Sequence, residues 1–180
     1  MAWVVWFTGL PGCGKTTIAQ SVKAKLSRKQ INVKILQLDE IRRAITPQPR
    51  YTEEERDIVY ASLAYMAKLL ADEGVNVMVD ATANRRRYRD FARSLIPNFG
   101  EVFIRADLET CMAREAERKA EFSPKGIYKK AAGKKAAVPG VNVAYEEPLS
   151  PEIEVDTQKM TADESASFIA ERILQNFSKA

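Results

Sequence analysis

A glycine-rich segment near the start of the chain carries the most specific chemistry in the sequence. Residues 9–16 read G-L-P-G-C-G-K-T, which matches the pattern G-x-x-x-x-G-K-[ST]. In such a loop the backbone curls until several N–H groups point at one anion, and the following helix adds its positive end. Lys15 can then reach the outer phosphates of a nucleotide, and the Thr16 hydroxyl can bind Mg²⁺. The predicted ATP site comprises Gly9, Leu10, Pro11, Gly12, Cys13, Gly14, Lys15, Thr16 and Thr17.

Two aspartates follow predicted strands and are candidates for the transfer chemistry. Asp39 comes after V-K-I-L-Q-L at 33–38, where it could accept the proton of an attacking hydroxyl or help to hold Mg²⁺. Asp80 ends V-N-V-M-V-D at 75–80, a position typical of a carboxylate that orders Mg²⁺ through water. A helix cap is the alternative interpretation of each. We predict Thr16, Asp39 and Asp80 as the metal site.

Several arginines are candidates for contacting the phosphates. Arg42 lies three residues after Asp39 and could reach an acceptor phosphate. Arg114 and Arg118 are four residues apart, one helical turn, and phosphoryl transfer needs cations over the migrating group. Ordinary surface charge is the alternative for this pair. For the run R-R-R-Y-R at 85–89 we prefer a solvated helix face.

A basic stretch at 121–138 interrupts the regular pattern and predicts a lid. It interleaves lysines with aromatic residues: Lys125, Lys129, Lys130, Lys134 and Lys135 with Phe122 and Tyr128. Such a segment suits closure over a polyanion, and it would exclude water that could otherwise be phosphorylated. A flexible linker is the alternative. We place the mobile lid at about 115–148.

Alternating strand and helix signals must position these residues. Apolar runs at 3–7, 33–38, 75–80, 101–106 and 152–155 predict five strands. Helical spacing follows the glycine loop, capping boxes begin at Thr52 and Thr161, and Asn84 is a candidate cap for the helix after the third strand. The alternation predicts one α/β domain over 1–180, with a parallel sheet covered on both faces. Such sheets bind ligands beyond the carboxyl ends of their strands.

Composition narrows the class of protein. The net charge of +4 and the pI of about 9.0 suit an anionic small molecule and do not call for nucleic acid. Cys13 and Cys111 are the only cysteines and there is no histidine, so any general base is a carboxylate or the substrate itself. Two thiols form no disulfide framework, and no apolar stretch reaches membrane-spanning length. We expect a cytoplasmic protein with no membrane partner.

Five motifs resemble the adenylylsulfate kinase family of P-loop kinases. That family begins W-x-T-G-L-S-G-S-G-K-[ST]-T, and residues 6–17 read W-F-T-G-L-P-G-C-G-K-T-T. Its D-G-D-N-[IV]-R-H-G-L matches Q-L-D-E-I-R-R-A-I at 37–45, and its D-P-K-G-L-Y-K-K-A matches S-P-K-G-I-Y-K-K-A at 123–131. Its P-Y-E-x-P and L-V-L-D-T are echoed by A-Y-E-E-P at 144–148 and I-E-V-D-T at 153–157. The similarity spans nearly the whole chain, and K-G-I-Y-K-K-A is its most specific part.

The resemblance implies a fold, a reaction and a set of site residues. The fold would be the three-layer α/β/α arrangement of P-loop NTPases, and members are usually homodimers. The reaction would be ATP- and Mg²⁺-dependent phosphorylation of the 3′-hydroxyl of adenylylsulfate, giving 3′-phosphoadenylylsulfate in sulfate assimilation. Asp39 would be the catalytic carboxylate, and together with Lys15 of the glycine loop and Arg114 of the predicted helix it completes the predicted catalytic set. The acceptor would be bound by Asp39, Arg42, Tyr51, Arg56, Lys125, Gly126, Ile127 and Tyr128.

Departures from the family pattern cluster on the acceptor side and keep two alternatives open. Val59 and Ala61 stand where the family has an acceptor-binding Asn and an Arg, and Val138 stands where it has one of two stacking phenylalanines. About eight residues are inserted between Glu115 and Pro124, and Gln37 replaces the first aspartate of D-G-D. A kinase with a different acceptor is therefore the first alternative. A non-catalytic nucleotide-binding regulatory module is the second, although no N-K-x-D motif of a GTPase switch is present.

Overall fold

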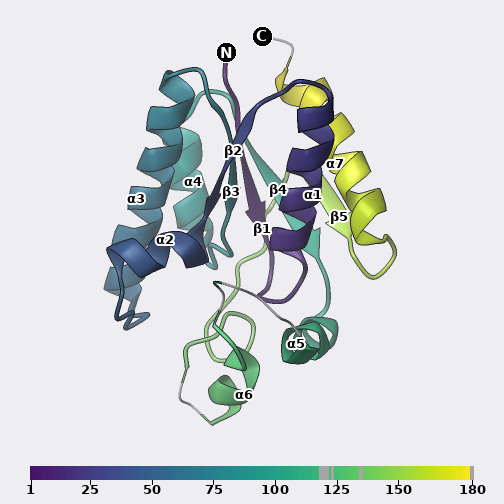
Figure 1. Cartoon of the computed structure of the whole chain (residues 1–180). Coiled ribbons are helices and arrows are strands. Elements are labelled where there is room, and N and C mark those ends of the chain that lie inside the picture. Colours follow the sequence, from purple (N-terminus) through teal and green to yellow (C-terminus); the bar gives the residue numbers. More distant parts are fainter. Residues whose placement is uncertain (118–121, 123, 134–135, 179–180) are drawn as a thin grey trace.

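Five parallel strands form the central sheet of a computed structural model that describes residues 1–117, 122, 124–133 and 136–178 (Figure 1). The strands are β1 (Val4–Thr8), β2 (Val33–Gln37), β3 (Asn76–Asp80), β4 (Phe99–Arg105) and β5 (Ile153–Asp156). Their order is β2-β3-β1-β4-β5, and every pairing is parallel. All five predicted strands are confirmed. The second ends at Gln37 because Leu38 already begins a helix.

Helices cover both faces of the sheet, as predicted. They are α1 (Lys15–Arg28), α2 (Leu38–Ile45), α3 (Glu53–Asp72), α4 (Arg86–Leu95), α5 (Leu108–Glu117), α6 (Ile127–Ala132) and α7 (Ala162–Phe177). In Figure 1, α1 and α7 lie on one face and α3 and α4 on the other. Strand β1 is buried on both sides: Val5 and Phe7 belong to the hydrophobic cluster under α1 and α7, and Val4 and Trp6 to the cluster under α3 and α4. The central strand is therefore apolar at nearly every position.

Side-chain caps fix where two of the helices begin. Thr161 caps α7 with both halves of the predicted capping box, and the Thr52 side chain accepts a hydrogen bond from the Glu55 amide at the start of α3. The second half of the Thr52 box is absent, because the Glu55 carboxylate accepts from the amides of Arg50 and Tyr51. The prediction that Asn84 caps α4 is wrong. Arg85 is the N-cap residue, and the Asn84 side chain bonds Arg56 and Ala144 instead.

The predicted lid is partly described. It contains the short helix α6, which the sequence pattern did not indicate, and in Figure 1 this helix lies below the carboxyl ends of the strands. Arg118, Lys134 and Lys135 lie outside the described residues. Movement of the lid stays a prediction. Within the described part of the chain, no helix has both the length and the apolar character needed to cross a bilayer.

Candidate functional site

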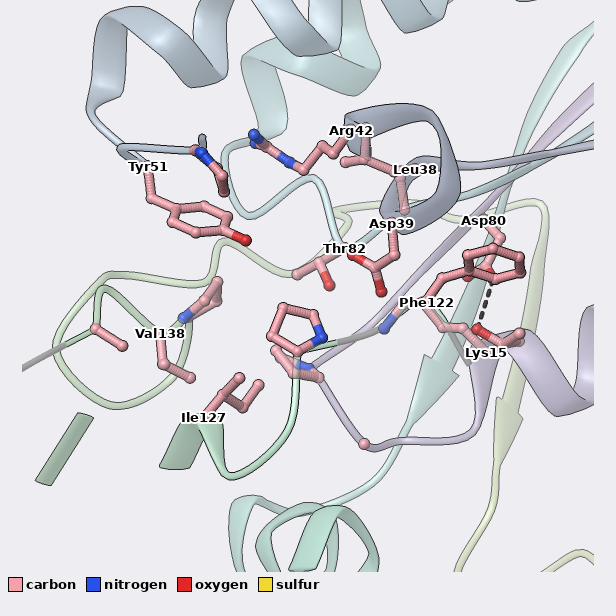
Figure 2. Close-up of a pocket in the computed structure, with 18 of the residues that line it drawn as sticks. Lys15, Leu38, Asp39, Arg42, Tyr51, Asp80, Thr82, Phe122, Ile127 and Val138 are labelled. Atoms are coloured by element: carbon pink, nitrogen blue, oxygen red, sulfur yellow. Dashed lines mark hydrogen bonds between the residues drawn. The ribbon is translucent and has the colours of Figure 1, made fainter. Parts of the chain in front are cut away.

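A cavity of about 1400 Å³ opens at the carboxyl ends of β1, β2 and β3 (Figure 2). Its walls come from the glycine loop, α2, the start of α3, α5, and residues 136–143. Among the described residues that line it, the cationic ones are Lys15, Arg42, Arg50, Arg56, Arg114 and Lys130, and the acidic ones are Asp39, Asp80 and Glu117. Six cations against three carboxylates favour an anionic ligand.

The glycine loop wraps around its own lysine. Lys15 is buried, and its Nζ donates hydrogen bonds to the carbonyl oxygens of Gly9 and Leu10, both at 3.0 Å. Gly12 has a φ of +84°, and a Cβ there would collide with the carbonyl oxygen of Cys111. A side chain at this position would therefore push the loop away from α5. The loop and its lysine are already shaped as a cradle for phosphates.

Thr16 and Asp80 meet directly across the cradle. The Thr16 hydroxyl donates to a carboxylate oxygen of Asp80 at 2.6 Å, and Asp80 ends β3 with only 5% of its surface exposed. Asp80 is not a helix cap, because α4 begins six residues later at Arg86. A hydroxyl and a carboxylate are hard oxygen donors of the kind Mg²⁺ prefers, and Mg²⁺ sites in kinases take one or two carboxylates plus substrate phosphates. The two residues fit such an ion.

Asp39 lines the same cavity from just beyond the neighbouring strand β2, whose last residue, Gln37, is paired with Asp80. It stands in the first turn of α2, whose N-cap is Gln37, so the alternative of an N-cap aspartate is wrong. Figure 2 shows its carboxylate pointing into the cavity, which it lines from a half-buried position. Thr82, two residues beyond Asp80, also points inward (Figure 2). Thr82 was not among the predicted site residues, although its position just beyond a strand end was a usable signal.

Tyr51 and two arginines form one end of the cavity. Arg42 and Arg56 are both 7% exposed, and their guanidinium carbons lie 4.9 and 5.9 Å from the centre of the Tyr51 ring. Tyr51 has a φ of +56°, a left-handed conformation held by the Glu55 carboxylate at its amide and by Arg56 Nε at its carbonyl oxygen, 3.2 Å away. Burial raises the pKa of the Tyr51 phenol, which therefore stays protonated at neutral pH. Val138 faces the cavity from the lid segment (Figure 2).

The four lid residues predicted at the acceptor site lie in different environments in the structure. Ile127 lines the cavity. Lys125 is exposed to solvent, and neither it nor Gly126 is among the described lining residues. Tyr128 is buried and is not among the described lining residues. Its hydroxyl donates to the carbonyl oxygen of Pro11 at 2.6 Å. Tyr128 thus ties α6 to the glycine loop.

Arg114 lines the cavity from α5 and is held by Thr157, just after β5. Its Nη1 donates to the Thr157 hydroxyl at 2.8 Å and its Nη2 to the Thr157 carbonyl oxygen at 2.9 Å. Cys111, one turn earlier, is fully buried, and burial raises the pKa of its thiol to about 12. The Cys13 thiol is also buried with a raised pKa. Both thiols are therefore neutral, as expected for packing residues.

Comparison with known proteins identifies the family to which this chain belongs. The model of the adenylylsulphate kinase family matches residues 1–156. The chain belongs to the adenylylsulfate kinase family. The adenylyl-sulfate kinase of Rippkaea orientalis is 37% identical over 170 residues, which cover 94% of this chain and 90% of that protein.

Two further members show how the family domain occurs. The "Probable bifunctional SAT/APS kinase 2" of Sorangium cellulosum is 37% identical over 171 residues, which are 94% of this chain but only 28% of that longer protein. A solved structure of the Mycobacterium tuberculosis APS kinase CysC in complex with AMPPNP and APS superposes with a TM-score of 0.85 at 30% identity, covering 96% of this chain and 97% of that one. The adenylylsulfate kinase fold therefore accounts for nearly the full length of this chain.

Proposed function

We propose that this protein is an adenylylsulfate kinase that transfers the γ-phosphoryl group of ATP to the 3′-hydroxyl of adenylylsulfate. The observation that carries the proposal is the single cavity that runs from the glycine loop past Asp39 to Tyr51 and Val138. At 1400 Å³ it exceeds the ~300–1,000 Å³ typical of a site for one small ligand. It therefore has room for a donor and an acceptor nucleotide side by side. Family membership and the relative solved with AMPPNP and APS support the same pair.

The donor side works through the glycine loop. Phosphates entering the cradle would replace the Gly9 and Leu10 carbonyl oxygens as partners of Lys15. The lysine charge then lies against the β- and γ-phosphates as negative charge shifts toward the leaving oxygen. Arg114, held from behind by Thr157, adds a second cation on this side. When bound, Mg²⁺ would be held by Thr16 and Asp80 and would neutralise phosphate charge.

On the acceptor side, Asp39 and Arg42 act together with Tyr51 and Val138, which form the two walls of this end of the cavity. In the transfer, a bond forms between the acceptor 3′-oxygen and the γ-phosphorus while the bond to the β–γ bridging oxygen breaks. Asp39 accepts the proton of the 3′-hydroxyl, since the chain has no histidine to do so. Tyr51 offers a ring face for the acceptor base, and Arg42 a buried cation for its anionic tail.

We also propose a cytoplasmic homodimer. The exposed side of α3 carries Ile58, Tyr65 and Leu69, which are 69%, 54% and 48% exposed and are spaced seven and four residues apart. This spacing puts them on one helical face. A second copy of the chain is the partner that best suits such a stripe, and light scattering of the wild type against Ile58→Glu tests it. Two buried free thiols fit a reducing compartment.

An ADP-release assay with ATP, Mg²⁺ and a panel of acceptors tests the function. We expect turnover with adenylylsulfate and none with sugars or with nucleoside monophosphates that lack the sulfate. Turnover with another acceptor and not with adenylylsulfate would show that the pocket changes at Val59, Ala61 and Val138 altered the substrate. Nucleotide binding without turnover on any acceptor would favour a regulatory module.

A further inference from the structure

Asn84 is a buried amide that connects two segments beside the acceptor end of the cavity. Its side chain is 1% exposed and does not belong to the described lining of the large cavity. Nδ2 donates to the Ala144 carbonyl oxygen at 3.0 Å, and Oδ1 accepts from Nη1 of Arg56 at 3.1 Å. Its main-chain oxygen accepts from the Glu146 amide at 2.7 Å. Asn84 therefore joins the start of α3 to the end of the lid segment.

Arg56 extends this connection to both walls of the acceptor end. Besides its bond to Asn84, Nε donates to the Tyr51 carbonyl oxygen at 3.2 Å and Nη2 to the Ala137 carbonyl oxygen at 3.0 Å. Ala137 immediately precedes Val138, whose amide is held by the side chain of Asn142 at 2.7 Å. A guanidinium group is planar and carries its donors in a fixed fork. The three bonds therefore set the positions of the Tyr51 backbone and the Val138 turn relative to each other.

We propose that Asn84 is a positioning residue for the acceptor, acting through Arg56 to hold the Tyr51 and Val138 walls at the separation that a planar base needs. The inference rests on the proposed function. It also gives Arg56 a role different from direct contact with the acceptor's anionic tail, because the three bonds point its fork at the protein itself. Loss of Asn84 would free one arm of the fork without removing any side chain from the cavity lining.

Kinetics of two variants at Asn84 and a matched control test the proposal. Asn84→Leu removes both side-chain bonds, and we expect the KM for adenylylsulfate to rise about tenfold with the KM for ATP unchanged. Asn84→Asp keeps the oxygen that Arg56 bonds but loses the donor to the Ala144 carbonyl oxygen, so its KM for adenylylsulfate is expected to rise less than that of Asn84→Leu. The control is Asn98→Leu, which removes a bond to the Phe177 carbonyl oxygen far from the cavity. This control variant is expected to leave both KM values unchanged.

A double variant separates positioning from direct binding. Arg56→Lys keeps the charge, but its single ammonium nitrogen cannot reproduce the three bonds that the guanidinium group makes to Tyr51, Asn84 and Ala137. We therefore expect it to raise the acceptor KM about as much as Asn84→Leu. If both act through one fork, the pair together is no worse than Arg56→Lys alone. Effects that multiply, or an Asn84→Leu variant with a normal acceptor KM, would overturn the proposal.

Hydrogen exchange gives a readout that needs no acceptor. In Asn84→Leu, amides of residues 136–146 are expected to exchange faster than in the wild type, while those of β1 stay protected. Unchanged exchange in 136–146 would overturn the positioning role whatever the substrate is. Failure of the wild type to phosphorylate adenylylsulfate, with the exchange result as expected, would instead refute the proposed function and leave the Asn84–Arg56 connection in place.

Discussion

Replacing Tyr51 with alanine is expected to raise the KM for adenylylsulfate by about tenfold or more. The ring lines the cavity, with the guanidinium groups of Arg42 and Arg56 lying 4.9 and 5.9 Å from its centre. Removing one aromatic partner of a stacked base typically costs roughly 1–3 kcal/mol, which corresponds to about 5- to 150-fold in affinity. Tyr51→Phe keeps the ring, so its KM is expected to stay within about threefold of the wild type.

The backbone at Tyr51 provides a control for stability. Because φ is +56°, alanine at this position keeps the strain of a left-handed residue, whereas glycine relieves it. The strain of a non-glycine residue there is about 1–2 kcal/mol, so Tyr51→Gly is expected to unfold at higher urea concentration than Tyr51→Ala. Both lack the ring. A similar KM in two variants of different stability would assign the kinetic effect to the lost ring.

Initial rates of ADP release, with adenylylsulfate and ATP varied in turn, measure the effect, and urea unfolding measures stability. The KM for ATP is expected to be unchanged, because Tyr51 lies at the opposite end of the cavity from the glycine loop (Figure 2). A wild-type KM for adenylylsulfate in Tyr51→Ala would refute stacking at this wall. A Tyr51→Phe variant as impaired as Tyr51→Ala would assign the role to the hydroxyl.

Three further substitutions test the rest of the site. Lys15→Ala is expected to lower kcat by about 10²–10³-fold and to weaken ATP binding, and near-normal turnover in a folded variant would remove the nucleotide site from the glycine loop. Asp39→Asn is expected to keep ATP binding, measured by titration, while kcat falls more than about tenfold, since an amide cannot take the hydroxyl proton. Val138→Phe is expected to lower the KM for adenylylsulfate by up to about tenfold, because Val138 lines the cavity and a phenyl ring there would offer the acceptor base a second aromatic face. A lower Tm with a raised KM in that variant would show that the ring overpacks the core instead.

The sheet and the donor side were predictable because their signals are local. Val4 to Phe7 are all apolar because β1 is buried on both faces, and the glycine loop has the same pattern wherever it binds phosphate. Asp80 was predicted to end a strand, and the structure places it at the end of β3 beside Thr16. The cap at Thr161 follows from a four-residue pattern. Each of these features depends on residues close together in the sequence.

The acceptor side was harder to predict because its bonds connect distant segments. Asn84 fits the pattern of a helix cap, yet its amide bonds Arg56 and Ala144, which lie 28 and 60 residues away. The sequence pattern predicts that Tyr128 is a lid aromatic residue facing the ligand, but its hydroxyl donates to the carbonyl oxygen of Pro11, 117 residues earlier. A single sequence carries no signal for such partners. Helix α6 has only six residues, too few to show a period.

The place of β1 in the sheet has a consequence for how the chain folds. β1 precedes the other four strands in this sequence, yet it lies at the centre of the sheet, where it pairs with β3 and β4, whose residues end at Asp80 and Arg105. The glycine loop joins β1 to α1, and β1 has both of its neighbours in the sheet only when the segment up to Arg105, more than half of the 180 residues, is available to pair. Parallel pairings over such sequence separations form slowly. Nucleotide binding therefore reports completed folding, and ATP added during refolding is expected to stabilise only chains that have already paired their first strand.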